Sequence, residues 1–565
     1  MFLLIIGLWL LCLLYFNPRL IALLIGPEPL IAKAFLLIFI IELDFFCLYV
    51  FFHLVIVAFS YFAKKSCFSG VSFADNFCAT GKLFPPVAFL YTTCNDFQEP
   101  AALSHLNQDY SNSHFFILDD STDISLQKKI DEFSARFPLA LTVIRRKNKN
   151  GFKAGNINYA LRLLDAKFKY FSVSDSDTVI PRDYISSLLP YLTNPRIAFV
   201  QSAQATNISQ QTQFARFMGP NTDIHFRHYA STKNRYGFVM WYGHGALLRR
   251  DVCERIGGIP EIATEDLAYS MKVREQGFEG IFVEKVCCYE DFPPTYKQYR
   301  KRNEKWVRGT AECLAKFFPY FCQSKHIPWI EKIDVLLSAL SLLLALPFVI
   351  LLILTGLFLP LFFTHFQFQG PMIRMPVLVD KTPLRLLLEI GSNLFWGWDV
   401  FWLMLATIFA PLLAPIIDYW RTPGTLFRYL ASYIFSFFSL QVVSAIHLIV
   451  FLLTGRAVFP VTGEGDSTQR PKFQKGKGIF LHPHANNRLV FLTEALMGII
   501  FLYIGSIQQN FWFIPLGTAL SLSPFLFEWN LNSKLLRYAV FAPLAMVLAI
   551  LYFISKQLPT IYKTG

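Results

Sequence analysis

Long apolar runs alternate with one extended polar stretch along this chain. Residues 2–25 and 34–62 form two such runs, and further runs of similar length lie near residues 332–364, 394–417, 489–507, 510–528 and 535–556. Because a helix needs about 20 apolar residues to cross a bilayer, each run predicts a transmembrane helix. Residues 63–325 contain no run of that length, and their mixed polarity predicts one large soluble domain.

Short apolar segments typical of strands alternate with amphipathic segments typical of helices inside this domain. Strands are predicted at 87–94, 114–118 and 139–144 and within 170–181, and helices after the turn at 95–100 and over 124–137. Such alternation favours an α/β fold with a mainly parallel sheet and helices on both faces. Ligands of such sheets bind beyond the carboxyl ends of the strands.

Composition supports a membrane protein. The 565 residues are 54% hydrophobic and only 16% charged, with 52 basic and 39 acidic residues and a net charge of +13. Basic residues concentrate in the soluble stretch and in 470–488. Positive segments stay on the cytosolic side, so we expect a multi-pass protein of the inner (plasma) membrane, surrounded by membrane lipid, with a cytosolic soluble domain. No recognition motif for nucleic acid is present, and the scattered cysteines indicate neither a zinc site nor a disulfide framework.

Two carboxylates follow the apolar segment that begins at Tyr170. Asp175-Ser176-Asp177 precedes Val179-Ile180, which resembles a buried strand running into a turn. Hard oxygen ligands converging from one turn suit Mg²⁺ or Mn²⁺ shared with a diphosphate. The alternative is a turn in which the aspartates bond their own backbone.

Acids also follow the segment 114–118, at Asp119 and Asp120. They suit recognition of a base or ribose, because carboxylates accept from ring N–H groups and sugar hydroxyls; the alternative is helix N-capping. In the basic segment 145–156, Lys153 offers a point charge to a phosphate between two glycines that permit close backbone approach. A solvated basic loop is the alternative there.

These features together resemble the processive family 2 glycosyltransferases, the group of cellulose, hyaluronan and chitin synthases. The likeness is greatest to the catalytic subunit of bacterial cellulose synthase and covers roughly residues 85–480. It is carried by five ordered motifs: Asp119-Asp120, Gly151-Phe152-Lys153-Ala154-Gly155-Asn156, Asp175-x-Asp177, Thr264-Glu265-Asp266 and Trp306.

The resemblance implies a GT-A (Rossmann-like) glycosyltransferase domain inserted between transmembrane helices, with an NDP-sugar donor and Mg²⁺ or Mn²⁺. Asp119, Asp120 and Lys153 would bind the donor nucleotide, and Asp175 and Asp177 would hold its diphosphate through the metal. No nucleic acid is expected as a partner.

The same resemblance makes Asp266 the general base, with Glu265 and Thr264 beside it. Read locally, Thr264 is equally a helix N-cap followed by acids in the first turn. The segment with Gly243 and His244 is similar to the family's acceptor-side loop, although His244 departs from the small residue expected there.

The family signature Gln-x-x-Arg-Trp appears here as Arg302-Asn303-Glu304-Lys305-Trp306. Trp306 would be the platform on which an acceptor sugar stacks, or alternatively an interfacial anchor. Lys305 lacks the planar fork of arginine, so Arg302 is expected to supply the missing contact to the donor.

A family gating loop is recognised at Phe459, Val461 and Thr462, with Glu464 in place of lysine. Placing that loop in the cytosol makes 425–455 interfacial rather than spanning. The expected organisation is 1–62 with two transmembrane helices, 63–325 catalytic, 326–424 a transmembrane pair, 425–488 interfacial helices with the gating loop, and 489–565 transmembrane.

The expected function is therefore a membrane-embedded, processive, inverting β-glycosyltransferase. It would transfer sugar from a UDP-sugar, with UDP-glucose as the expected donor, to a growing polysaccharide acceptor. It would also move the product across the membrane, with accessory export subunits as expected further partners. The alternative is a non-processive enzyme that adds a single sugar to a lipid carrier.

Overall fold

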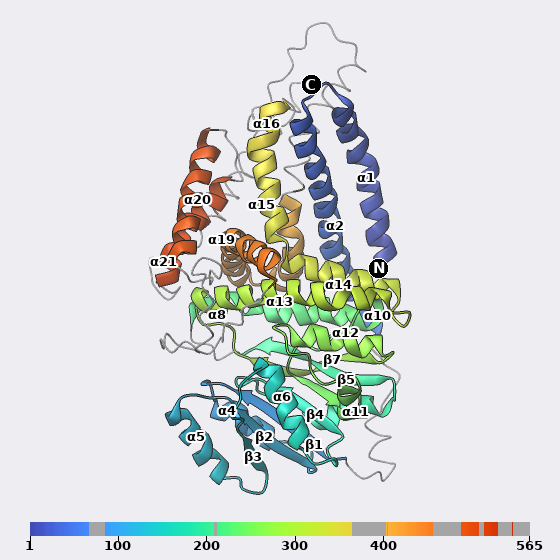
Figure 1. The fold of residues 1–565 in the computed structure, drawn as a ribbon, viewed down its shortest axis with the longest axis vertical. Coiled ribbons are helices and arrows are strands. Elements are labelled where there is room, and N and C mark those ends of the chain that lie inside the picture. The colour runs from blue at the N-terminus through green and yellow to red at the C-terminus, as the bar shows by residue number, and fades with distance from the viewer. Residues whose placement is uncertain are drawn as a thin grey trace.

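A computed structural model describes residues 1–66, 85–207, 212–363, 405–455, 488–507 and 513–528, with the single residues 403 and 545. Figure 1 shows three levels along the long axis of the protein. A sheet with its covering helices lies at one end, upright apolar helices lie at the other, and helices that run crosswise separate them. The predicted gating-loop residues Phe459, Val461, Thr462 and Glu464 lie outside the described residues.

Seven strands form one mixed sheet in the order β3-β2-β1-β4-β6-β5-β7. The strands are β1 (Val87–Thr93), β2 (Ser113–Asp119), β3 (Leu141–Ile144), β4 (Tyr170–Ser174), β5 (Ile197–Thr206), β6 (Ala246–Arg249) and β7 (Glu279–Glu290). All neighbours pair in parallel except β6, which is antiparallel to β4 and β5. The predicted α/β fold is confirmed as a GT-A-like mixed sheet, in which β6 interrupts the parallel pairing.

Both faces of the sheet are covered, because alternate residues of a strand point to opposite sides. Along β1, Phe89 and Tyr91 belong to one apolar cluster, whereas Ala88 and Leu90 belong to another on the opposite face. The covering helices are α4 (Glu99–Leu106), α5 (Ile124–Ala135), α6 (Phe152–Leu163), α7 (Tyr184–Leu188), α11 (Arg250–Arg255) and α12 (Glu265–Glu275). Burial on two faces explains why β1 reads as a continuous apolar run.

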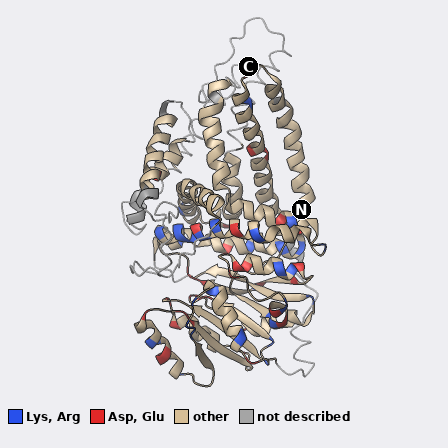
Figure 2. Cartoon of the chain, in the orientation of Figure 1, with Lys and Arg blue, Asp and Glu red and all other residues tan. Residues whose placement is uncertain are grey.

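The crosswise level joins the sheet to the apolar helices. Its elements are α8 (Gln213–Met218), α9 (Pro220–Ile224), a π-helical turn (His225–Ala230), α10 (Ser231–Tyr236), α13 (Tyr296–Gln323) and α14 (Trp329–Leu342). Buried ion pairs fix it in place: Lys233 of α10 pairs with Asp334 of α14, and Arg300 of α13 pairs with Glu494 of α20 (Arg488–Ile507). Figure 2 shows basic residues gathered along this level and few charges on the upright helices.

Three described helices are long and apolar enough to cross a membrane: α1 (Phe2–Ile25), α2 (Leu30–Ser66, over Leu30–Tyr61) and α19 (Pro423–Thr454). The stretch 332–364, predicted as one span, is not one straight helix, because α14 and α15 (Ala345–Ile353) meet at an angle of 62°. Figure 1 shows α14 in the crosswise level and α15 upright. Counting that bent pair as one span gives up to four spans in the described part of the chain.

A 3₁₀ turn (Leu189–Thr193) follows α7, and the other described helices lie on the carboxyl-terminal side of α15. They are a π-helical turn (Leu354–Phe358), α16 (Leu359–Phe362), a 3₁₀ turn (Ala410–Leu412), α18 (Leu413–Tyr419) and α21 (Phe513–Glu528). Residues 425–455, which were predicted to be interfacial, are almost entirely within one helix, α19. The polar residues Ser439 and Ser444 of α19 form hydrogen bonds with α13. In Figure 1, α19 lies across the direction of α1, α2 and α15.

Candidate active site

The paired carboxylates sit just beyond the carboxyl end of β4, the central strand of the sheet, which has β1 as one neighbour. The turn after β4 is closed by Thr178, whose hydroxyl accepts the Asp175 N–H at 3.2 Å. The carboxylates point elsewhere: Asp175 accepts from Lys153, and Asp177 accepts the Asp291 N–H at 3.2 Å. The turn therefore does not use its own aspartate side chains to cap itself, and both remain available for chemistry.

Opposed charges surround this pair. Burial would raise the pKa of Asp175, but the charge of Lys153, and then that of His244, outweighs burial and lowers it to about 2. Burial, followed by the charges of Asp175 and Glu290, raises the pKa of Asp177 to about 7. Neighbouring carboxylates with divergent pKa values are typical of functional sites.

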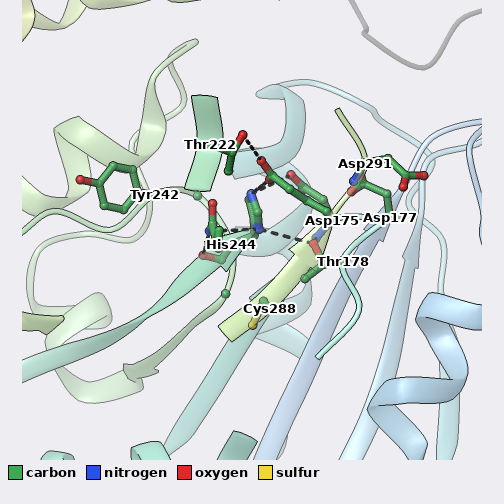
Figure 3. A network of polar contacts seen from close by, with 12 residues as sticks. Asp175, Asp177, Thr178, Thr222, Tyr242, His244, Cys288 and Asp291 are labelled. Atoms are coloured by element: carbon green, nitrogen blue, oxygen red, sulfur yellow. Dashed lines mark hydrogen bonds and ion pairs between the residues drawn. The ribbon is translucent and has the colours of Figure 1, made fainter. Parts of the chain in front are cut away.

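His244 lies beside these carboxylates. Its Nε2 is 3.1 Å from Glu290 and 4.0 Å from Asp175, and Figure 3 shows its ring directed toward Asp175 and Thr178 while Tyr242 points away. Burial lowers its pKa, but the hydrogen bond to Glu290 and the charge of Asp175 outweigh burial and raise it. His244, predicted for the acceptor side, is thus placed against the Asp175–Asp177 turn.

Glu290 and Asp291 are members of this site that the motif analysis missed. They end β7, which pairs in parallel with β5, so they reach the same edge of the sheet as the other strand-end acids. The available signal was an apolar strand running into Tyr289-Glu290-Asp291, the pattern that identified the acids at 119–120 and 175–177.

The backbone at Gly243 lies between Lys153 on one side and the acids that begin α12 on the other. Its carbonyl accepts from Lys153 Nζ at 2.9 Å, and its φ of 85° lies in the left-handed region that favours glycine. A Cβ here would lie 3.6 Å from Asp266 Oδ2 and 3.8 Å from Glu265 Oε1. Lys153 and Asp266, which are 113 positions apart (266 − 153), therefore face one short piece of backbone.

Asp266 lies in the first turn of α12. Burial, followed by the negative charge of Glu265, raises its pKa to about 6. Thr264 occupies the N-cap position, but its side chain makes no capping hydrogen bond and donates instead to the Gly309 carbonyl at 2.9 Å. The local interpretation of Thr264 as a capping side chain is therefore wrong, and its hydroxyl instead ties α12 to α13.

Asp119 and Asp120 are each paired with an arginine. Arg145 donates to Asp119 at 2.6 Å, and Arg146 donates to both carboxylate oxygens of Asp120 through Nε and Nη2, with its shortest contact at 2.7 Å. The helix that follows is capped by Asp123, so the N-cap alternative for this acid pair is wrong. Arg146 also donates to the Asn150 and Phe152 carbonyls, and these bonds join Asp120 to the start of α6, which carries Lys153.

Removal of the Arg146 side chain is expected to destabilise the protein markedly. The side chain of Arg146 is 4% exposed and that of Asp120 13%, so Arg146→Ala would leave a largely buried carboxylate unpaired. Such a loss costs about 3–5 kcal/mol of the free energy of unfolding. Arg136→Ala is the matched control, because its pair with Glu99 is exposed and is worth about 1 kcal/mol or less. Thermal unfolding of both variants measures the contrast; equal midpoints would contradict it.

The signature residues of α13 divide into two environments. Trp306 is 38% exposed, with Arg302 stacked 4.6 Å from its ring centre. The charge of Lys305 acts on both Asp175 and Asp266 and favours their ionised forms. The charges of Glu290 and Asp177 also act on Arg302, so both signature cations lie near the carboxylates, and Arg302 is in addition held among aromatic rings.

The carboxylate oxygens of this site fit a divalent metal ion that also binds a ligand. In the described ranges, no three His, Cys, Asp or Glu side chains form a metal site. Asp175 and Asp177 nevertheless offer carboxylate oxygens, and Mg²⁺ or Mn²⁺ commonly completes its shell with phosphates and water. The pKa of Asp177, raised by burial and then by adjacent negative charge, is what a bound cation would lower.

Comparison with known proteins gives a family for this arrangement. Residues 170–455 match the profile of Glycosyl transferase family group 2. A probable glucomannan 4-beta-mannosyltransferase of Arabidopsis thaliana is 25% identical over 229 residues, which cover 39% of this chain and 52% of the relative. Glucomannan 4-beta-mannosyltransferase 1 of Cyamopsis tetragonoloba is 24% identical over 229 residues, covering 39% of this chain and 43% of the relative. The chain spans about half the length of the curated relatives it matches.

Among solved structures, the mannosyltransferase PcManGT from Pyrobaculum calidifontis, in complex with GDP-Man and Mn²⁺, aligns with a TM-score of 0.40 and 16% identity. That alignment covers 66% of this chain and 99% of the other. Staphylococcus aureus TarS aligns with a TM-score of 0.32 and 15% identity, over 62% of this chain and 55% of the other.

Proposed function

Because this chain belongs to Glycosyl transferase family group 2, we propose that it is a processive, inverting β-glycosyltransferase that extends a polysaccharide from an NDP-sugar. UDP-glucose is the proposed donor, and a specific kinship with the catalytic subunit of bacterial cellulose synthase is part of the proposal. The observation that carries it is the meeting of Lys153 and Asp266 at the Gly243 backbone. This geometry supports a reaction centre at which Lys153 binds the phosphate of the donor on one side and Asp266 receives the proton of the acceptor on the other.

The chemistry follows from these positions. Asp266 takes the proton of the acceptor hydroxyl while the hydroxyl oxygen forms a bond to the anomeric carbon of the donor sugar. The bond from that carbon to the diphosphate breaks on the opposite face, which inverts the configuration. Lys153 and Lys305 stabilise the charge that develops on the departing diphosphate. A divalent ion held by Asp175 and Asp177 would supply further stabilisation of that leaving group.

The pH dependence of transfer is expected to report Asp266. A base must be ionised, and the pKa of Asp266 is raised to about 6 by burial and Glu265, while Lys305 and Lys153 oppose the shift. Activity is therefore present above pH 6 and lost as pH falls through it, by about tenfold per unit in kcat/KM. Measurement of kcat/KM between pH 4.5 and 8 tests this; a profile that stays flat down to pH 4.5 would contradict it.

A series of aromatic rings supports processive export through the membrane helices. From Tyr242, beside Gly243, rings follow at centroid distances of 5.5 Å to His225, 5.8 Å to Tyr229 and 5.5 Å to His53 of α2. His225 is exposed, and Tyr229 is half-buried. Rings with polar handles suit an oligosaccharide, which presents both apolar faces and hydroxyls. We propose that the growing chain leaves the acceptor site along this series.

The orientation proposed from the sequence is retained. The catalytic part would lie in the cytosol beneath the inner membrane, with membrane lipid around the upright helices and accessory export subunits as further partners. The basic residues along the crosswise level, shown in Figure 2, support this orientation, because positive segments remain cytosolic.

A mannosyl polymer is the second candidate product. It is favoured by the relatives, whose names describe glucomannan 4-beta-mannosyltransferases. The chain spans only about half the length of those relatives, so the identity of the transferred sugar has to be determined by experiment.

Product analysis tests the proposal. Purified protein in nanodiscs would receive Mn²⁺ or Mg²⁺ with radiolabelled UDP-glucose, GDP-mannose, UDP-N-acetylglucosamine or UDP-galactose in turn. A high-mass product from one donor, digested by a linkage-specific glucanase or mannanase, would establish the polymerase and name its sugar. A single labelled sugar on an organic-extractable lipid would overturn the processive proposal in favour of transfer to a lipid carrier.

A further inference from the structure

Arg302 lies among three aromatic rings on the active-site side of α13. Its guanidinium carbon is 4.3 Å from the centre of Phe292, 4.6 Å from Trp306 and 5.5 Å from Tyr299. Tyr299, Arg302 and Trp306 follow the i, i+3, i+7 spacing that puts side chains on one helix face. Phe292, from the segment before α13, stacks on Tyr299 at 5.7 Å and completes the enclosure.

The guanidinium is engaged through its faces rather than through its N–H groups. In the part of the chain that the structure describes, Arg302 forms no ion pair, and its Nε has no hydrogen-bond partner. Glu304, two residues further on, is paired with Arg308, and Arg300 is paired with Glu494. Arg300 also lies over an aromatic ring, that of Tyr296 at 5.9 Å, but among these three arginines only Arg302 has no carboxylate partner within the described residues.

Lys305 occupies the other role that the signature predicts. Its charge reaches Asp175 and Asp266, on either side of the reaction centre. A compact ammonium on a flexible stem suits neutralisation of changing charge, whereas a planar guanidinium suits stacking on indole. With Lys305 in that role, the aromatic contacts of Arg302 support an assignment other than the phosphate contact expected of it.

We propose that Arg302 is a positioning residue for the acceptor, because its guanidinium fixes the indole of Trp306 in the orientation on which an acceptor sugar stacks. The assignment rests on the proposed function, in which Trp306 is the acceptor platform. The cation lies over the indole, and Trp306 remains partly exposed. The glutamine expected at this position in the family signature has no charge with which to hold the ring.

Two variants separate stacking from charge, and a third is the control. Arg302→Gln restores the expected family residue, and Arg302→Lys keeps the charge but loses the plane. Arg421→Gln is the matched control, because Arg421 lies 5.0 Å from the ring of the exposed Trp420, in the turn between α18 and α19. All are made in the full chain in nanodiscs, labelled with 5-fluorotryptophan, and the Trp306 resonance is assigned by its loss in Trp306→Phe.

Arg302→Gln is expected to shift and broaden the Trp306 fluorine resonance. The KM for an oligosaccharide acceptor should rise about five- to tenfold, in line with the strength of a partly buried cation–π contact, while the KM for the donor changes less than twofold. Arg302→Lys should give the same direction of change, and Arg421→Gln should change neither quantity.

An unchanged Trp306 resonance with a raised donor KM would overturn the proposal and make Arg302 a donor ligand. Wild-type behaviour of Arg302→Lys in both readouts would also overturn it, since charge alone would then suffice. If the wild-type protein extends no acceptor from any donor, the proposed function fails, yet the fluorine resonance still decides whether Arg302 orients Trp306.

Discussion

Asp266→Asn is expected to lower kcat for sugar transfer by about 10²- to 10⁴-fold, the range that a positioned general base contributes. Asparagine keeps the shape of the side chain and its hydrogen bond with the Leu267 N–H, made at 2.8 Å, but cannot take up a proton. Release of nucleotide diphosphate with and without acceptor measures the loss. The acceptor-dependent rate should fall, while donor binding, measured by calorimetry, stays within about threefold.

The control for this variant is Asp251→Asn. Asp251 also lies in the first turn of a helix, α11, but it is exposed and pairs with neighbouring Arg249. Its loss should leave transfer within twofold of the parent protein. Retention of more than a tenth of the parent activity by Asp266→Asn would exclude Asp266 as the base and would move attention to Glu265, its buried neighbour.

Asp177→Asn is expected to lower transfer by about 10²-fold or more and to raise the Mn²⁺ concentration needed for half-maximal activity by at least about tenfold. The reason is the loss of one of two carboxylates that converge from the turn after β4. Asp165→Asn is the matched control, because Asp165 also sits in a turn but uses its carboxylate to accept the Lys167 N–H at 2.9 Å.

Although Asp177→Asn is expected to lower activity, it is expected to keep or raise the thermal stability of the metal-free protein. A folded-state pKa raised to about 7 means that the ionised Asp177 disfavours folding as pH rises above its unfolded pKa, and fully so above 7. The neutral asparagine removes that repulsion, so the metal-free variant should unfold at the same or a higher temperature than the parent at pH 8. A lower midpoint in EDTA, together with unchanged Mn²⁺ dependence, would show that Asp177 has a structural role only.

The strand-end acids were predictable because they depend on local pattern. Apolar segments of five to seven residues fix strands β2 and β4, and the acids that follow them must then leave the sheet at its carboxyl edge. The pairing of β1 with both strands in parallel puts Asp119 and Asp175 on either side of it. A two-residue periodicity and the topology rule for parallel sheets were sufficient for this part of the site.

The contacts of these acids were not predictable from the same pattern. The pairing of His244 with Glu290 joins the loop before β6 to the end of β7, and β6 enters the sheet antiparallel. No periodicity encodes which charged groups meet across such distances in sequence. The partners are selected by packing of the sheet and by the need to neutralise charges that burial removes from water.

The sequence by itself determined the class of the protein: an α/β domain with acids at its strand ends, set among apolar helices, because burial and backbone periodicity are local properties of the chain. Only the tertiary structure decided that Lys153 and Asp266 meet at Gly243, that α14 and α15 bend by 62°, and that Arg302 stacks on Trp306. These outcomes depend on how distant surfaces pack, where the cost of an unpaired buried charge and the shape of aromatic faces select one arrangement among many that the local pattern permits.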